Sequence, residues 1–354
     1  MFNTQLHKLR YSTISNRIIF SSLFFLLVTF ILFSLSISNG PVKVSFYDLI
    51  SIFTFSLFGS TEVDNVNSQV VVNIRLPRII LALIVGSSLS ISGAVLQGIF
   101  KNPMADPSII GVSSGAATGA VISIAFGFSS LSIFVLPFFS FTGGVIAAIL
   151  VFSLSKFASN NSNISFILAG LAIATFLNSI ISLIILSSKE FGALTAILNW
   201  LAGGLQDSRW EHVLIIAPIF IICFPLLLIY SHKINILCLN DDSATTLGLN
   251  VNNTRFTLLI ITTLLTSVSV AVCGIIAFVG IMVPHIVRLV TGPDNRIVIP
   301  ASAFFGAVFI LGADFIARTV IVPTELRLGI ITSFIGAPFF IYLIIKQRKI
   351  MIER

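Results

Sequence analysis

Long apolar runs separated by short polar stretches occupy the chain from residue 18 to residue 345. A helix that crosses the roughly 30 Å hydrocarbon core of a bilayer needs about 20 mostly apolar residues. Lipid offers no hydrogen bonds to the backbone, so such runs predict helices rather than open strands. Ten predicted spans follow: 18–38, 79–100, 109–126, 131–154, 164–186, 212–230, 256–273, 275–290, 297–317 and 329–345.

Composition excludes the main soluble classes. Of the 354 residues, 56% are hydrophobic and only 9% are charged, and the mean hydropathy is +1.08. An average soluble chain is about a quarter charged. The net charge of +7 is spread between apolar runs, so we expect no nucleic-acid partner. The sequence therefore predicts an all-α polytopic membrane protein that forms a single transmembrane domain over residues 1–354.

The distribution of basic residues predicts the orientation. Ten spans place both termini on one side, and cytoplasmic segments carry an excess of Lys and Arg. With cytoplasmic termini, 13 basic residues lie inside and seven outside. The first run is too long for the apolar region of a signal peptide, so we interpret it as a helix. These features predict a multi-pass protein of the cytoplasmic (inner) membrane.

Four arginines depart from this rule, because each is expected at the outer end of a span: Arg75, Arg78, Arg318 and Arg327. Their side chains could simply reach up to lipid headgroups, or they could have a function. Asp314 lies four residues before Arg318, the favourable order for an intrahelical ion pair. That pair would leave Arg318 partly exposed.

Two polar segments interrupt the apolar pattern. Residues 98–107 contain Pro103 and Pro107, which break a helix, and Asn102 and Asp106, which can bond the freed backbone groups. This density of breakers predicts a fixed, packed re-entry of the chain. Small residues in the neighbouring spans predict close helix–helix faces; they include Gly86, Ser90, Gly93, Gly115 and Gly119.

The longest predicted inner loop covers residues 231–254. Within it, Asp242 or Ser243 could cap a short helix that Gly248 would terminate. This helix is either a surface connector or a knob that a soluble partner binds.

Catalytic motifs are missing from the sequence. It has no G-x-x-x-x-G-K-[ST] phosphate loop, no H-E-x-x-H and no G-x-S-x-G. His285 follows Pro284 and is more typical of a packing residue than of a metal ligand, so we expect no metal and no cofactor. The spans also lack the buried acid cluster of an ion-coupled carrier. The chain is therefore expected to be a transport or anchoring subunit without its own energy source, and not an enzyme.

Nine short motifs, in order along nearly the whole chain, resemble those of one known family. They are Arg75-Leu-Pro-Arg78, Gly93-Ala-Val-Leu-Gln97 with Asn102-Pro-Met-Ala-Asp-Pro107, Gly111-Val-Ser-Ser-Gly-Ala116, Leu168-Ala-Gly170, Trp200-Leu-Ala-Gly-Gly204, Ala244-Thr-Thr-Leu-Gly248, the run from Gly274 to Arg288, Ala313-Asp-Phe-Ile-Ala-Arg318, and the run from Gly329 to Phe340. The family is the FecCD-type permeases of binding-protein-dependent ATP-binding cassette (ABC) importers for iron–siderophores, haem and cobalamin. One departure is Arg327, where the family usually has proline.

The resemblance implies a type II ABC importer permease with about ten helices, in which helices two to five and seven to ten form an inverted repeat. It implies pairing with a second permease copy or a close paralogue, two ABC ATPase subunits inside, and a substrate-binding protein outside. In the sequence, Gly98…Pro103 and Gly280…Pro284 are a possible trace of that repeat.

The resemblance also implies roles for individual residues. Sockets for the binding protein are expected at Arg75, Arg78 and Arg318. The helix that couples to the ATPase is expected to include Asp242, Ala244, Leu247 and Gly248. An inner gate is expected at Ser162 and Asn163. The transport pathway is expected to be lined by Asn178, Ser179 and Ser182.

Cargo is the least determined expectation. Ferric siderophore is the commonest cargo of the family, and haem and cobalamin are the alternatives. From other classes, an ion-coupled secondary transporter and a polytopic membrane enzyme remain competing interpretations.

Overall fold

The structure is a computed structural model that describes residues 27–38, 44, 66–158, 163–188, 190–321 and 324–352. Across these residues every regular element is helical, which confirms the predicted all-α class. Six helices are long and apolar enough to cross a membrane, and five shorter apolar helices accompany them.

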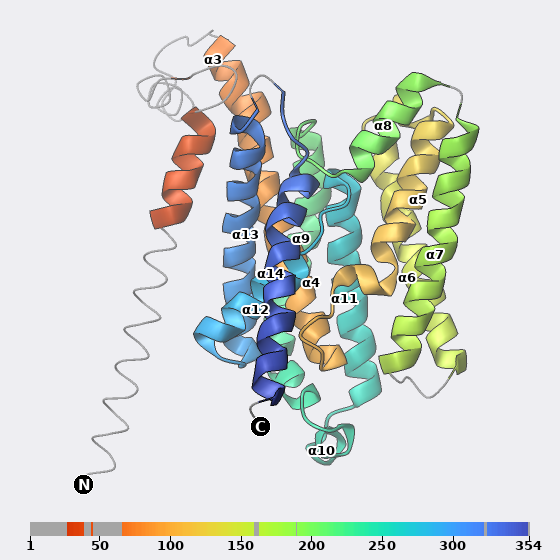
Figure 1. Cartoon of the computed structure of the whole chain (residues 1–354), viewed down its shortest axis with the longest axis vertical. Helices are drawn as coiled ribbons and strands as arrows, with labels where there is room; N and C mark the ends of the chain where they lie inside the picture. The colour runs from red at the N-terminus through yellow and green to blue at the C-terminus, as the bar shows by residue number, and fades with distance from the viewer. Residues whose placement is uncertain are drawn as a thin grey trace.

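The elements follow one another as nearly upright helices (Figure 1). After the helix Leu27–Ser38 come α3 (Val66–Gln69), a π-helical segment (Val70–Arg75), α4 (Leu76–Phe100), a 3-10 turn (Pro107–Ile110), α5 (Val112–Ala125), a second 3-10 turn (Phe128–Ser130), α6 (Val135–Ala158), α7 (Asn163–Ser187), α8 (Phe191–Leu201), α9 (Trp210–Leu237), α10 (Asp241–Thr246), α11 (Val251–Cys273), α12 (Val279–Thr291), α13 (Asn295–Thr319) and α14 (Leu328–Ile352).

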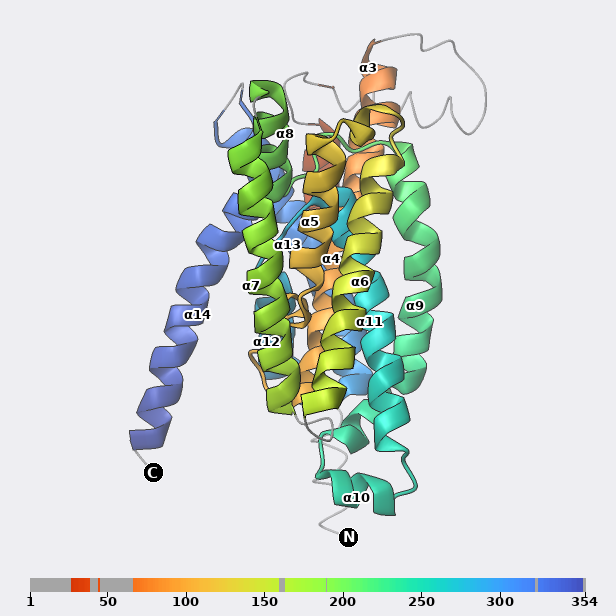
Figure 2. The same ribbon diagram turned by 90° about the vertical axis from the view of Figure 1, so that its right-hand side faces the viewer.

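The two ends of the bundle carry different short elements. One end holds α10 and the end of α14, and we name it the α10 face (Figure 1). The opposite end holds α3 and α8, and we name it the α8 face. From the side, α14 diverges from the other helices toward the α10 face (Figure 2).

Helices extend beyond the predicted spans at several ends. The run that begins at Val66 continues unbroken to Phe100, so it starts 13 residues before the predicted position 79. Likewise α9 continues to Leu237 and α11 starts at Val251, which shortens the predicted loop 231–254 to residues 238–250. Hydrophobicity marks only the part of a helix that lies in lipid, because the backbone hydrogen bonds continue until a cap or a breaker ends them.

The predicted re-entry after α4 is present. Lys101 adopts a left-handed conformation (φ 52°) that ends α4. Asn102 Oδ1 accepts a hydrogen bond from the Met104 amide at 2.9 Å, and Asp106 Oδ1 accepts one from the Ser108 amide at 2.9 Å. The two polar side chains therefore bond the backbone where the helix is broken, as the sequence predicts.

A second break faces the first and reveals the inverted repeat. Residues 274–278 separate α11 from the 13-residue α12, as residues 101–111 separate α4 from the 14-residue α5. The long helices α4 and α11 run in opposite directions (Figure 1). The sequence trace at Gly280…Pro284 was misplaced, because both residues lie inside α12 and the break precedes them.

Glycine contacts hold α4 in the centre of the bundle. A Cβ on Gly86 would lie 2.2 Å from the Gly306 carbonyl oxygen of α13, and one on Gly93 would lie 1.9 Å from the Gly280 oxygen of α12. Side chains at these positions would separate the helices. The packing role predicted for the small residues of this span is therefore confirmed.

Candidate docking and coupling surfaces

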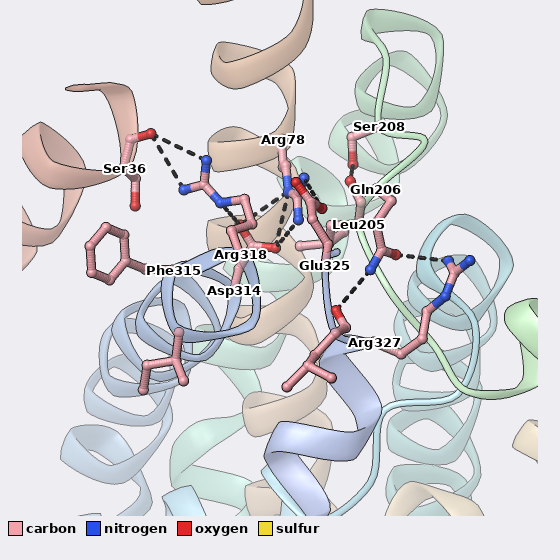
Figure 3. A network of polar contacts seen from close by, with 12 residues as sticks. Ser36, Arg78, Leu205, Gln206, Ser208, Asp314, Phe315, Arg318, Glu325 and Arg327 are labelled. Carbon is pink, nitrogen blue, oxygen red and sulfur yellow. Dashed lines mark hydrogen bonds and ion pairs between the residues drawn. The ribbon is translucent and has the colours of Figure 1, made fainter. Parts of the chain in front are cut away.

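Arg78 is the centre of a buried cluster of charges at the α8 face (Figure 3). Its Nε and Nη2 donate to Asp314 Oδ1 at 3.0 and 2.9 Å, and its Nη1 donates to Glu325 Oε2 at 2.9 Å. Arg318 Nε lies 3.2 Å from Asp314 Oδ2, which confirms the predicted intrahelical pair. One carboxylate thus joins arginines from α4 and α13.

Two arginines also contact the end of the first described helix. Both Nη atoms of Arg318 donate to the Ser36 carbonyl at 3.4 Å, and Arg75 Nη1 donates to the Ile37 carbonyl. We name the five charged side chains, Arg75, Arg78, Asp314, Arg318 and Glu325, the α8-face charge cluster.

The arginines of this cluster are more buried than the sequence predicted. Arg75, Arg78 and Arg318 are only 4–5% exposed, so the partial exposure predicted for Arg318 is wrong. Arg75 and Arg78 also lie inside the continuous helix 66–100 and not at its end. For Arg78 the reason is tertiary: acids from α13 and from the segment before α14 meet this arginine of α4.

The ion pairs of the cluster are shared between elements of the bundle. Among the described residues, Asp314 pairs with Arg78 and Arg318, and Glu325 pairs with Arg78. Glu325 has the most exposed side chain among the paired members, at 22%, against 1% for Asp314. The cluster is therefore most accessible from the α8 face at Glu325, a residue that lies outside the motifs of the sequence analysis.

The coupling segment forms a compact projection at the α10 face, which we name the α10 knob (Asp241–Gly248). Asn240 is the N-cap, so the helix starts earlier than the predicted caps Asp242 and Ser243. Gly248 ends it with φ 81°, and the Leu249 amide donates back to the Ala244 carbonyl at 3.0 Å. This left-handed closure confirms the predicted role of Gly248.

The predicted coupling residues do not all face outward. Asp242 is exposed, and Leu247 is 62% exposed, an unusual position for leucine on a projecting turn. Ala244 is 1% exposed and packs into the core beneath the knob, so it cannot contact a partner directly. Ala244 instead attaches the knob to the helix bundle by packing into its core.

Asp241 holds the knob in place through ion pairs, a role that the sequence analysis did not assign to it. Its carboxylate lies 3.0 Å from Lys101 Nζ and 3.3 Å from Arg255 Nη2. Burial opposes ionisation, but the hydrogen bond from Lys101 and the charge of Arg255 outweigh it and lower the pKa of Asp241. The two basic residues come from the end of α4 and from α11, so only the fold brings them to Asp241.

The predicted pathway residues share one exposed side of α7. Asn178, Ser179 and Ser182 are exposed, and the two serine hydroxyls donate to carbonyls one turn earlier, at 3.0 and 2.9 Å. Thr175 continues the same row. Of the predicted gate, Ser162 lies outside the described residues, and so does the side chain of Asn163.

No group of three or more His, Cys, Asp or Glu residues suited to a metal ion occurs in the described part of the chain. His285 instead packs edge-on against Phe339, with ring centroids 6.2 Å apart.

Comparisons with known proteins agree with this arrangement. The FecCD transport family matches residues 26–346. The cobalamin import permease BtuC of Halobacterium salinarum is 44% identical over 278 residues, covering 78% of this chain and 74% of the relative. The Fe(3+) dicitrate permease FecD of Escherichia coli is 38% identical over 279 residues, covering 79% and 86%.

A solved structure has the same fold over nearly its whole length. It is an inward-facing conformation of a protein described as a metal-chelate type ABC transporter, with a TM-score of 0.81, 32% sequence identity, and coverage of 92% of this chain and 98% of that chain. The type II ABC permease architecture is thus shown by both fold and sequence. The chain therefore belongs to the FecCD transport family and is a permease subunit of an ABC importer, in which separate ATPase subunits hydrolyse ATP.

Proposed function

We propose that this permease imports a metal chelate, with ferric siderophore as the first candidate, across the cytoplasmic membrane. The observation that carries the proposal is the presence of an arginine-rich charge cluster at one end of the bundle and of a projecting knob at the other. The α8 face is then external and the α10 face cytoplasmic, which agrees with the excess of basic residues in the predicted inner segments. Both termini are cytoplasmic.

Docking of a substrate-binding protein takes place at Arg75, Arg78 and Arg318. Since these side chains are buried, a carboxylate from outside approaches the cluster beside Glu325, its more exposed acid. An exposed ion pair contributes only about 0–1 kcal/mol, so several such contacts are needed and docking stays reversible.

Coupling to the two ATPase subunits takes place at the α10 knob. Exposed Leu247 and Asp242 form the contact, while Ala244 and Gly248 maintain its shape. Because Asp241 ties the knob to α4 and α11, a push on the knob moves these helices as one body.

The pathway lies between two permease copies, identical or paralogous, and the polar row on α7 borders it. Most of α7 is exposed in the single chain, including Leu171, Phe176 and Leu183 at 60% or more. Such a surface requires lipid or a second copy beside it. Small hydroxyl groups that are already bonded to their own helix let a bulky cargo pass without binding it tightly. Ser162 and Asn163 remain our proposed inner gate.

Cargo identity rests on family frequency. The two relatives compared above are named for different chelates, cobalamin and Fe(3+) dicitrate, so family membership does not select one. Titrating the cognate binding protein with ferric siderophores, haem and cobalamin identifies the cargo. Tight binding of haem or cobalamin alone would overturn the siderophore assignment.

The coupling proposal is tested in proteoliposomes that contain the permease, its ATPase and its binding protein. We expect Leu247→Asp to abolish the stimulation of ATPase activity by the loaded binding protein, since it places a charge in an apolar contact. The matched control is Leu239→Asp, because Leu239 is also exposed (47%) and lies in the same connection. Equal loss in both variants, or in neither, would contradict a specific contact at Leu247.

A gradient experiment separates the proposal from an ion-coupled carrier. Proteoliposomes that contain the permease alone, with a proton or sodium gradient, should show no uptake. Uptake under those conditions would overturn the proposed ATP-driven import.

A further inference from the structure

A second polar site lies at the α8 face, apart from the charge cluster. It is a cavity of about 560 Å³ between α8, the start of α9, the end of α11 and the turn before α6, and we name it the α8 cavity. Its apolar side includes Ile133, Leu136 and Val272. Its polar side is formed by Asn199, Gln206, Asp207, Arg209, His212 and Arg327.

Among the described residues, the side chain of Arg327 has a neutral hydrogen-bond partner and no ion-pair partner. Its Nη1 donates to Gln206 Oε1 at 2.8 Å, and no carboxylate of the described chain lies within ion-pair distance (Figure 3). Gln206 Nε2 in turn donates to the Leu326 carbonyl at 2.9 Å. By contrast, two carboxylates neutralise Arg78. The guanidinium of Arg327 is therefore held in place while its charge stays uncompensated.

The turn that carries Gln206 brings its amide close to the backbone of Gly204. A Cβ on Gly204 would lie 2.1 Å from Gln206 Oε1, and Gly203 has φ 65°, a conformation that favours glycine. The glycine pair thus places the amide against Arg327. An arginine fixed in this way loses little side-chain entropy when a carboxylate binds to it.

The other formal charges that line the cavity cancel each other. Arg209 and Asp207 are both exposed and cancel formally, and His212 Nδ1 accepts a hydrogen bond from the Arg209 amide at 3.3 Å. With neutral His212, the lining carries one net positive charge, that of Arg327. The site is therefore complementary to an anionic group, and its apolar side is complementary to an adjacent aliphatic or aromatic group.

We propose that the α8 cavity is a second docking site, which takes an acidic loop of the substrate-binding protein with its carboxylate on Arg327. The inference rests on the proposed function, since it assigns the α8 face to that partner. A volume of about 560 Å³ exceeds the need of one carboxylate, so a neighbouring apolar side chain of the loop enters with it.

The test measures the affinity of the cognate binding protein for the complete importer in lipid nanodiscs. We expect Arg327→Glu to weaken binding at least tenfold, and Arg327→Lys to weaken it less, because charge is kept while the fixed two-point contact is lost. The control is Arg296→Glu, an exposed arginine outside both sites, which should bind as the unaltered protein does. Unchanged affinity of Arg327→Glu would overturn the inference.

A labelling experiment locates the contact within the cavity. Ser129 lines the cavity, as does the buried native Cys273, so Ser129→Cys in a Cys238→Ser, Cys273→Ala background introduces one thiol there without either native cysteine. We expect the bound binding protein to slow maleimide labelling of this thiol. Protection by free ferric chelate without the protein, or no protection by the protein, would overturn the inference.

The two proposals fail differently. If the unaltered importer neither binds nor responds to any binding protein, the proposed function is wrong. If it does so, and Arg78→Glu abolishes binding while Arg327→Glu does not, only the second docking site is wrong.

Discussion

The two faces of the permease use the same kinds of charged residue in opposite ways. At the α8 face, Asp314 is 1% exposed and joins two arginines deep between helices. At the α10 face, Asp241 is 52% exposed and also joins two basic residues, Lys101 and Arg255. This difference in solvent exposure decides how much each carboxylate contributes to the stability of the fold.

A buried charge must be compensated, whereas an exposed one is hydrated whether or not it is paired. Removal of one partner from a buried pair typically costs 3–5 kcal/mol, because the other charge stays in a medium of low dielectric constant. An exposed pair contributes about 0–1 kcal/mol. The α8-face charge cluster is therefore part of the fold itself, and any docking role depends on its less buried member. At the α10 knob, the ion pairs of Asp241 contribute little to stability, and buried Ala244 attaches the knob to the bundle.

The largest expected effect is that of Asp314→Asn. The change leaves Arg78 and Arg318 with one carboxylate between them, so we expect the free energy of unfolding to fall by about 3–5 kcal/mol. Thermal unfolding in detergent, followed by the fluorescence of a thiol-reactive dye that labels the buried cysteines as they become exposed, measures the change. A variant as stable as the unaltered protein would show that the cluster does not hold α4 against α13.

An intermediate effect is expected for Glu325→Gln. It removes the negative charge of the more exposed acid, so an incoming carboxylate of the binding protein meets less repulsion beside Arg78 and should bind several-fold more tightly. Affinity in nanodiscs is the measurement, with Glu190→Gln as control, because Glu190 is an exposed acid before α8. Weaker binding would mean that Glu325 assists docking instead of competing with the incoming carboxylate.

The smallest effect on stability is expected for Asp241→Asn, about 0–1 kcal/mol. Because the pKa of Asp241 is lowered in the folded protein, its contribution is complete above the ordinary carboxyl value near 3.9 and is lost as the pH falls below it. Stability profiles of variant and unaltered protein between pH 3 and pH 7, at low and high salt, measure it. A loss as large as that of Asp314→Asn would remove the contrast between the faces.

Sequence reasoning located the membrane spans and the family but not the partners of the charges. Arg78, Asp314 and Arg318 were each recognised, and the pair within one helix followed from a spacing of four. Contacts between residues 78 and 314 or between 101 and 241 span 236 and 140 positions, and no local pattern encodes them. The same limit explains why Ala244 was expected at a contact surface that its burial excludes.

Local chemistry by itself determined the helices, the break after α4, and the glycine that closes the α10 knob, because hydrophobicity, proline and left-handed backbone act over a few residues. The family, too, was readable from ordered motifs. Only the tertiary structure decided which arginines are compensated and which keep their charge. That outcome depends on which acids the packed helices bring within about 3 Å, and the strength of an ion pair depends on the solvent that packing excludes.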